Sequence, residues 1–231
     1  MTDTLLVIPT YNNAGTLENV LQRARSLGLP VLVVDDGSTD ATPEILRRMG
    51  VQVLTHPRNR GKGAALKTGL RWAREQGFSY AVTLDSDGQH FPEDVPALLA
   101  RQAPGTLVVG SRDTRGANAG SSFANRFSNF WFALYTGIRL PDTQTGFRLY
   151  PLRDLPPLGL VSARYEAELA LLVFSAWRGC KLVPVPVRVA YPEDRVSHFR
   201  PFRDFFRITV LNTLLLPLAI IYGWPARLFR K

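Results

Sequence analysis

Two aspartates spaced two residues apart, Asp85 and Asp87, are the residues of this chain best suited to metal chemistry. They follow a short apolar run at residues 80–84, so they begin where the chain leaves a predicted strand. Their carboxylates and the amide oxygen of Gln89 are hard oxygen ligands, which suit Mg²⁺ or Mn²⁺ held together with substrate phosphates. The spacing therefore predicts a divalent-metal site, with a solvated acidic turn as the alternative.

Three further polar motifs also follow short apolar runs. Residues 9–13 (PTYNN), 35–38 (DDGS) and 110–112 (GSR) each come directly after such a run. Ligands of open parallel sheets bind beyond the carboxyl ends of the strands, so we expect all four motifs at one edge. One carboxylate of the DDGS motif can accept a hydrogen bond from a nucleobase, on which Tyr11 can stack. A turn with a capping role is the alternative for DDGS.

The common nucleotide-binding signatures are absent from the sequence. No G-x-G-x-x-G follows the first apolar run, and Gly61-Lys62-Gly63 lacks the upstream glycine and the Ser/Thr of a phosphate-binding loop. A Mg²⁺-dependent phosphoaspartate enzyme, with Asp85 or Asp35 as nucleophile, is the alternative from another class. Such enzymes usually place that acid after the first strand, where this chain has Pro9.

The elements that position these motifs alternate between strand and helix. Strands buried on both faces are predicted at residues 5–8, 31–34, 51–54, 80–84 and 107–109. Helices are predicted at residues 16–26, 42–50, 63–76 and 92–102, the second with Thr42 as its N-cap and Pro43 at N1. This alternation indicates an α/β fold in which helices cover both faces of a mostly parallel sheet.

The second half of the chain is less regular. We predict a helix, a loop with a short strand, a second helix, a Pro-interrupted edge strand, and an apolar helix or helix pair, at residues 121–135, 142–150, 164–178, 182–190 and 201–222. The 231 residues fit one domain with a C-terminal appendage.

Composition narrows the partners of the chain. Its net charge of +9 favours an anionic partner, which can be nucleic acid, anionic lipid or a phosphorylated ligand. Of these three, we expect no nucleic-acid partner. A single cysteine, Cys180, excludes an internal disulfide framework. The first residues, MTDTLLVIPTYNN, lack the basic start of a signal peptide, so we expect a location on the cytoplasmic side. Nothing in the sequence predicts the oligomeric state.

The C-terminal segment is both basic and apolar. Residues 188–231 hold eight Arg or Lys against three Asp or Glu, and the 19 residues at 208–226 carry no charge. A straight helix of that length spans about 28 Å, barely the hydrocarbon core of a bilayer, and Pro217 interrupts it at its centre. We therefore predict a bent helix or helix pair lying in the membrane interface. A single spanning helix and a buried core or dimer helix are the alternatives.

Taken together, these motifs resemble the inverting glycosyltransferases of the GT-A (nucleotide-diphospho-sugar transferase) fold. The matching elements of the first half lie at residues 9–12, 33–40, 59–65 and 85–90. In the second half, the polyprenyl-phosphate sugar synthases are the subfamily that the chain resembles, through residues 110–112, Arg126, residues 142–148 and residues 195–198. The resemblance implies a glycosyltransferase domain at residues 1–200 and a membrane-associating segment at 201–231.

The resemblance also implies a role for each matching position. Catalysis would rest on Asp87, Arg112 and Arg126, the two arginines gripping the acceptor phosphate. The metal, Mg²⁺ or Mn²⁺, would be held by Asp85, Asp87 and Gln89. The donor nucleotide would contact Pro9, Tyr11, Asn13, Asp36, Lys62, Asp85, Arg195, Ser197 and His198, the last three on a closing loop.

The acceptor decides whether a general base is needed. A lipid monophosphate has a second pKa of about 6 and is already largely dianionic at neutral pH, whereas a hydroxyl of a glycan or small lipid requires a base. Candidate acceptor-side residues are Asp142, Gln144, Arg148, Glu166 and Glu168, with the three acids as possible bases. We expect transfer from a GDP-mannose or UDP-glucose type of donor to a polyprenyl phosphate, by an enzyme attached peripherally to the cytoplasmic face of the membrane.

Overall fold

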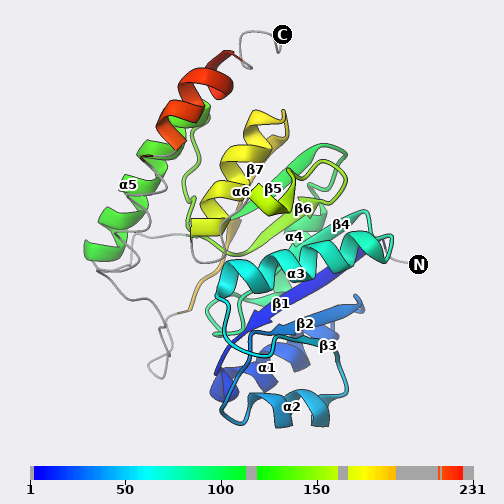
Figure 1. Cartoon of the computed structure of the whole chain (residues 1–231). Helices are drawn as coiled ribbons and strands as arrows, with labels where there is room; N and C mark the ends of the chain where they lie inside the picture. The colour runs from blue at the N-terminus through cyan, green and yellow to red at the C-terminus, as the bar shows by residue number, and fades with distance from the viewer. Residues whose placement is uncertain (1–2, 113–118, 161–165, 191–212, 214, 226–231) are drawn as a thin grey trace.

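A seven-stranded sheet is the centre of the computed structural model, which describes residues 3–112, 119–160, 166–190, 213 and 215–225 (Figure 1). Its strand order is β3-β2-β1-β4-β6-β5-β7. The strands are β1 (Thr4–Thr10), β2 (Val31–Asp35), β3 (Gln52–Thr55), β4 (Tyr80–Thr83), β5 (Thr106–Arg112), β6 (Arg148–Pro151) and β7 (Lys181–Val187). Only β6 among them runs antiparallel to its neighbours, β4 and β5. The predicted mostly parallel sheet is thus confirmed.

Helices cover both faces of the sheet, as the alternating pattern predicts (Figure 1). The α-helices are α1 (Ala14–Arg25), α2 (Thr42–Met49), α3 (Lys62–Glu75), α4 (Val95–Leu99), α5 (Ala119–Thr136) and α6 (Glu166–Trp177). Leu5 and Val7 of β1 pack toward α3, α5 and α6, whereas Leu6 and Ile8 pack toward α1, α2 and α4. Two 3₁₀ turns, η1 (Pro92–Asp94) and η2 (Leu158–Leu160), complete this part of the fold.

Three local predictions are wrong. The strand at 51–54, observed as β3, is not buried on both faces, because it is the edge strand and Gln52 and Thr55 are exposed. The helix predicted at 92–102 consists of η1 followed by the short helix α4. Thr42 is not an N-cap: it lies inside α2, the carboxylate of Asp40 accepts its N–H, and its Oγ1 accepts the N–H of Asn13.

The strand β7 is the opposite edge of the sheet, as its prolines predict. It pairs in parallel with β5 along its whole length. Pro184 and Pro186 have no backbone N–H to donate to a second neighbouring strand, which an inner strand would require. Between β4 and β5, the short strand β6 is inserted from a distant part of the chain. The loop that precedes β6, residues 141–147, is thereby brought beside the carboxyl ends of β4 and β5.

The described part of the C-terminal segment, residues 215–225, is a helix that includes a π-helical turn η3 (Ala219–Gly223). Its inner face, with Leu215 and Ala219, is buried in the core, and Trp224 Nε1 donates to the carbonyl of Leu134 on α5 at 3.1 Å. Its outer face is exposed. Among the described residues, no helix has the length and apolar character needed to cross a bilayer. Residues 201–212 and 214 of the helix or helix pair predicted at 201–222 lie outside the described residues.

Candidate active site

The four polar motifs lie at one edge of the sheet, as predicted. β1, β2, β4 and β5 all run in the same direction, because β4 and β5 are each antiparallel to β6 between them. Their carboxyl ends therefore meet at one edge, which carries residues 9–13, 35–38, 85–90 and 110–112. This edge is the candidate site.

An ion-pair cluster occupies the centre of the site. Lys62, the first residue of α3, places its Nζ 2.8 Å from Asp85 Oδ1 and 3.1 Å from Glu168 Oε1 on α6. Burial lowers the pKa of Lys62, but the two carboxylates outweigh this effect and hold the pKa above its ordinary value. Burial likewise raises the pKa of Asp85, and the ammonium of Lys62 outweighs it and lowers the pKa. Lys62 and Asp85 are therefore charged near neutral pH, and the formal charges of the three side chains sum to one negative charge.

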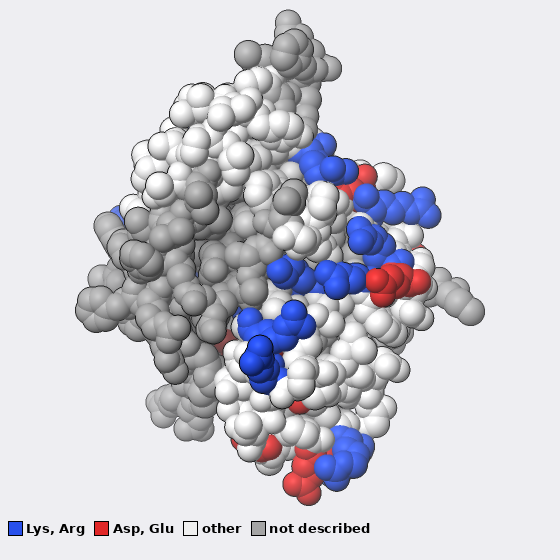
Figure 2. Space-filling model, viewed as in Figure 1, with Lys and Arg blue, Asp and Glu red and all other residues white. Residues whose placement is uncertain are grey.

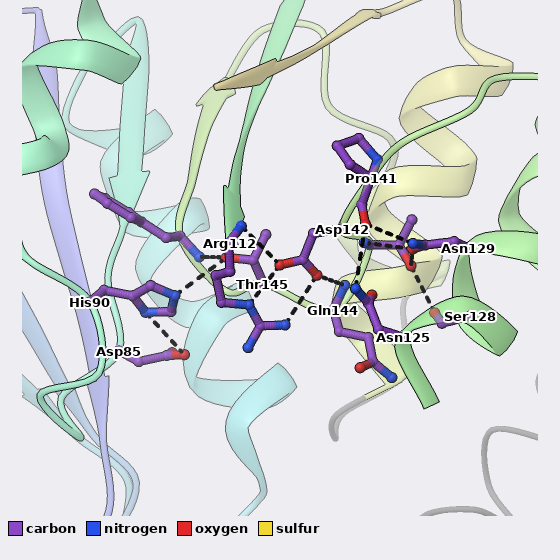
Figure 3. Close-up of polar contacts among 12 residues, drawn as sticks. Asp85, His90, Arg112, Asn125, Ser128, Asn129, Pro141, Asp142, Gln144 and Thr145 are labelled. Atoms are coloured by element: carbon purple, nitrogen blue, oxygen red, sulfur yellow. Dashed lines mark hydrogen bonds and ion pairs between the residues drawn. The ribbon is translucent and has the colours of Figure 1, made fainter. Parts of the chain in front are cut away.

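Gly146 lets the two carboxylates of this cluster converge. A Cβ at this position would lie 2.8 Å from Asp85 Oδ2 and 2.9 Å from Glu168 Oε1. The neighbouring His90 is buried, with Nδ1 4.0 Å from Asp85 Oδ2 (Figure 3). Burial lowers the pKa of His90 to about 4, so the imidazole is neutral near pH 7 and adds no charge. Any side chain at Gly146 would separate the carboxylates.

The predicted metal ligands lie on a tight turn after β4. Asp87 Oδ1 accepts the backbone N–H of Gln89 at 3.0 Å. Asn13, from the motif after β1, donates its Nδ2 to Ser86 Oγ at 2.7 Å and thereby ties the two motifs together. Among the described residues, no cluster of three or more His, Cys, Asp or Glu side chains is arranged to hold a metal. The predicted set has two carboxylates and an amide, and these donors fit Mg²⁺ or Mn²⁺ that also binds substrate phosphates.

Arg112, at the end of β5, is held by a buried carboxylate from the loop before β6 (Figure 3). Its Nε and Nη2 lie 2.6 and 3.0 Å from the two oxygens of Asp142, which is fully buried. Asp142 also accepts the backbone N–H groups of Arg112 and Gln144. Burial raises the pKa of Asp142, and the bonds and charge of Arg112 outweigh it and lower the pKa. Because its pKa is lowered, the Asp142 carboxylate takes up a proton less readily and is a poor general base.

Polar residues of α5 that the motifs did not single out fix the loop that carries Asp142 (Figure 3). Asn129 donates to the carbonyl of Pro141 and accepts from both the N–H and the hydroxyl of Thr143. Asn125 also donates to Pro141, and Ser128 Oγ lies 2.8 Å from Thr143 Oγ1. No sequence signal distinguishes these side chains from ordinary polar positions of an amphipathic helix. They orient Asp142, and through it Arg112.

Arg126, also on α5, is exposed. It lines a cavity of about 480 Å³ together with Asn129, Phe130, Leu134 and Arg139. Arg112 is not among the described residues that line this cavity. The shared grip of the two arginines on a phosphate stays a prediction.

Arg148, predicted as an acceptor-side residue, has a structural role in the described chain. It is fully buried on the inner strand β6, and its Nη1 and Nη2 donate to the backbone carbonyls of Glu168 and Thr143 at 2.6 and 2.9 Å. Its guanidinium therefore joins α6 to the loop before β6. A contact of Arg148 with the acceptor stays a prediction.

The remaining candidates occupy varied positions. Pro9 is buried at the end of β1, Tyr11 and Gln144 are at least partly exposed, and Glu166 begins α6. Arg195, Ser197 and His198, predicted to close over the donor, lie outside the described residues.

The two aspartates of the DDGS motif face different ways. Asp35 lines a cavity of about 580 Å³ at the ends of β2 and β3, together with Ser38, Thr39 and His56. Asp36, predicted to bind the base, is also buried but accepts hydrogen bonds from the backbone of Arg60 and Gly61. His56, which no motif singled out, contacts the Asp36 carboxylate.

Residues 5–152 match the family model described as glycosyl transferase family 2. Full-length relatives include an undecaprenyl-phosphate mannosyltransferase of Micrococcus luteus, 33% identical over 79% of this chain and 82% of the relative. A polyprenol monophosphomannose synthase of Mycolicibacterium smegmatis is 31% identical over 84% of this chain and 80% of its own length. A UDP-N-acetylglucosamine–dolichyl-phosphate N-acetylglucosaminyltransferase of Methanococcus voltae is 26% identical over 90% and 95%.

A similar solved structure is that of glucosyl-3-phosphoglycerate synthase from Mycobacterium tuberculosis, in complex with Mn²⁺, UDP and phosphoglyceric acid. It superposes with a TM-score of 0.69, covers 94% of this chain and 78% of its own, and is 22% identical. Because the sequence identity is low, this structural similarity establishes the GT-A fold alone.

Proposed function

The chain belongs to glycosyl transferase family 2 and is a glycosyltransferase, and we propose that it transfers a sugar, with inversion, from a nucleotide-diphosphate sugar to a membrane polyprenyl phosphate. One observation supports a polyprenyl phosphate as the acceptor. Three relatives that align with 79–90% of this chain are named for a polyprenyl phosphate or its sugar conjugate: undecaprenyl phosphate, dolichyl phosphate and polyprenol monophosphomannose. The alignments extend beyond the family domain into the part of the chain that holds α6 and β7.

The donor side of the proposal rests on the acidic turn and its neighbours. Asp85, Asp87 and Gln89 would hold Mg²⁺ or Mn²⁺, which, when bound, neutralises charge that develops on the leaving nucleoside diphosphate. The formal charges of Asp85, Glu168 and Lys62 sum to one negative charge, and Asp87 adds a second. Because Lys62 offsets one of the three carboxylate charges, the formal charge of these four side chains is two negative, which matches one divalent cation. Donor contacts by Tyr11 and Asn13, which flank the same edge, belong to this proposal.

The residues on the acceptor side favour a nucleophile that is already negatively charged and needs no general base. Asp142 and Glu168, two of the three candidate bases, are each engaged with a cation, Arg112 and Lys62 respectively. A hydroxyl acceptor would need one of them to release its partner and take up a proton, whereas a lipid monophosphate needs only to be positioned. A guanidinium fixed by Asp142 suits that task, because it carries a permanent positive charge and five N–H donors, more than the two that face Asp142. We assign this role to Arg112, with Arg126 as a second phosphate contact.

The proposed acceptor implies a location of the enzyme at the membrane, because the prenyl tail of the acceptor stays in the bilayer. An apolar face of α5 and the C-terminal helix is exposed, with Ile221 74% and Phe130 62% accessible; the other members are Leu134, Leu218, Ile220, Tyr222 and Trp224. In Figure 2 the surface over the C-terminal helix and the adjacent end of α5 is white, whereas basic side chains gather over α3. Arg126 and Arg139 border this face in the 480 Å³ cavity. We infer that it lies against anionic lipid at the cytoplasmic face of the membrane, with residues 1–200 as catalytic domain and 201–231 as attachment segment.

A donor panel tests the proposed function. The purified protein is incubated with Mn²⁺, a polyprenyl phosphate and, in turn, GDP-mannose, UDP-glucose and other nucleotide sugars. We expect one donor to give a lipid-linked product that partitions into organic solvent and releases sugar phosphate on mild acid treatment. A thermal-shift series with the matching nucleoside diphosphates identifies the base in parallel. No lipid-linked product with any donor would contradict the proposal.

A further inference from the structure

The loops that follow β1 and β2 are joined by a set of hydrogen bonds centred on Asn12. The two strands pair in parallel up to their last residues, and the N–H of Asp36 donates to the carbonyl of Thr10 at 2.9 Å. Beyond this point, side chains of each loop bind the backbone of the other. We call these contacts, between residues 12–14 and residues 38–42, the loop clasp.

Asn12 takes part in the clasp with its side chain and with its backbone. Its Oδ1 accepts the N–H of Thr39 at 2.8 Å, and its own N–H donates to Ser38 Oγ at 2.9 Å. Its φ is +51°, the only positive φ of a non-glycine residue in the part of the chain that the structure describes. Apart from glycine, asparagine is among the few residues that adopt this left-handed conformation readily. Asparagine therefore supplies both the backbone conformation and the acceptor for Thr39.

The two residues after Asn12 are held by the same loop through separate contacts. The N–H of Asn13 donates to Thr42 Oγ1 at 3.2 Å, and the N–H of Ala14 donates to Asp40 Oδ2 at 3.1 Å. Both N–H groups lie at the start of α1, where the first donors of a helix have no acceptor within it. The second loop thus caps α1, and a change in the side chain of Asn12 leaves these two contacts in place.

Asn12 lies between the two predicted contacts of the nucleobase. Tyr11, expected to stack on the base, immediately precedes it, and Asp36, expected to accept a hydrogen bond from the base, lies two residues before Ser38. Asn12 is bonded to Ser38 and Thr39 of the second loop. The clasp therefore ties the backbone that carries Tyr11 to the backbone that carries Asp36.

We propose that Asn12 is a positioning residue of the donor site, which sets the distance between Tyr11 and Asp36 and thereby the discrimination among nucleobases. The inference rests on the proposed function, because it concerns a nucleoside-diphosphate donor. It gives a role to a residue of the first motif that had none. It also separates Asn12 from its neighbour Asn13, whose side chain donates to Ser86 in the acidic turn.

Calorimetry with UDP, GDP, CDP and ADP in the presence of Mn²⁺ tests this role. Asn12→Gly keeps the left-handed backbone and removes the acceptor for Thr39, so the base contacts should loosen while the phosphate contacts stay. The diphosphate that binds most tightly to the wild type should lose about 10-fold in affinity, the factor for one hydrogen bond to a charged group, and the others should lose less. An equal loss for all four diphosphates, or no loss, would overturn the proposal.

Two matched variants identify the hydrogen bonds responsible. Asn12→Asp keeps an oxygen that accepts the N–H of Thr39, so it should keep the discrimination among the four bases, because its added charge acts on every diphosphate alike. Ser38→Ala removes the acceptor for the N–H of Asn12 and should reduce the discrimination as Asn12→Gly does. If Asn12→Asp loses as much discrimination as Asn12→Gly, the bond to Thr39 is not the cause and the proposal fails.

Amide hydrogen exchange at Thr39, followed by NMR, provides a readout that needs no ligand. The N–H of Thr39 should exchange slowly in the wild type and in Asn12→Asp, and faster in Asn12→Gly. Rapid exchange of this N–H in the wild type would contradict the clasp, even if Asn12→Gly fails to fold. If the wild type binds none of the four diphosphates, the proposed function is contradicted, and the exchange at Thr39 still decides whether the clasp forms.

Discussion

Asp142 grips the guanidinium of Arg112 from the loop before β6, with both carboxylate oxygens engaged and the carboxylate fully buried. Arg112 is the last residue of β5, and this contact fixes the orientation of its side chain. It lies at the edge of the sheet where donor and acceptor would meet. Asn129 and Ser128 of α5 hold the same loop through Thr143. The pair is thus the end of a chain of contacts that begins on α5.

Replacing Asp142 by asparagine should destabilise the protein, because it leaves the charge of Arg112 without its buried partner. We expect a loss of about 3 kcal/mol in the free energy of unfolding near pH 7, measured by urea denaturation. Asp94→Asn is the matched control, since Arg188, the partner of Asp94, is largely exposed, and it should lose less. Equal losses in the two variants would contradict the account of Asp142.

The stabilising effect of Asp142 should disappear in acid. Its pKa in the folded protein is lowered, so its contribution is complete above the ordinary value of about 3.9 and is lost as the pH falls through the folded value. The difference in unfolding free energy between wild type and Asp142→Asn should therefore shrink below about pH 4. A difference that stays constant from pH 7 to pH 3 would show that the carboxylate charge is not the cause.

The acidic turn should be needed for turnover and not for folding. Asp87→Asn should reduce the rate at least about 100-fold, the effect of losing one electrostatic stabiliser, and weaken Mn²⁺ binding measured by paramagnetic resonance. The melting temperature should hardly change, because the contact of Asp87 Oδ1 with the N–H of Gln89 lies within the turn itself. Full activity in excess EDTA is the result that would exclude a metal at this turn.

Arg126 should serve the acceptor and not the donor. Arg126→Ala should weaken the apparent affinity for the lipid phosphate by about 1.5–3 kcal/mol, the value of a hydrogen bond to a charged group, and leave nucleotide binding unchanged. Arg101→Ala is the control, because Arg101 is another exposed arginine and does not line the cavity. Loss of nucleotide binding in Arg126→Ala would place this residue on the donor side instead.

The apolar face of α5 and the C-terminal helix should bind vesicles. Ile221→Asn removes one of its most exposed side chains and should reduce flotation with anionic vesicles about 10-fold or more, by the transfer free energy of one isoleucine. Ile221→Leu should keep binding, and salt should weaken it in both proteins. Unchanged flotation of Ile221→Asn would exclude this face as the contact with lipid.

The motifs and their edge could be predicted from the sequence because both depend on local patterns. Apolar runs define β1, β2, β4 and β5, and parallel strands bring whatever follows them to one side. The partners of buried charges could not be predicted in this way. Arg148 and Asp36 belong to polar motifs, yet both satisfy backbone groups that only the insertion of β6 and the approach of residues 57–61 create. His56 lies outside every motif for the same reason.

The choice between a phosphate and a hydroxyl acceptor is tested most directly by offering the enzyme the same prenyl chain in both forms. A polyprenyl phosphate and the corresponding polyprenol are compared at equal concentration in one detergent, with Mn²⁺ and the donor found in the panel. Because Asp142 and Glu168 are both engaged with cations, we predict that only the phosphate is glycosylated, with inverted configuration at the anomeric carbon. Comparable transfer to the polyprenol would contradict this account and require a general base at the site.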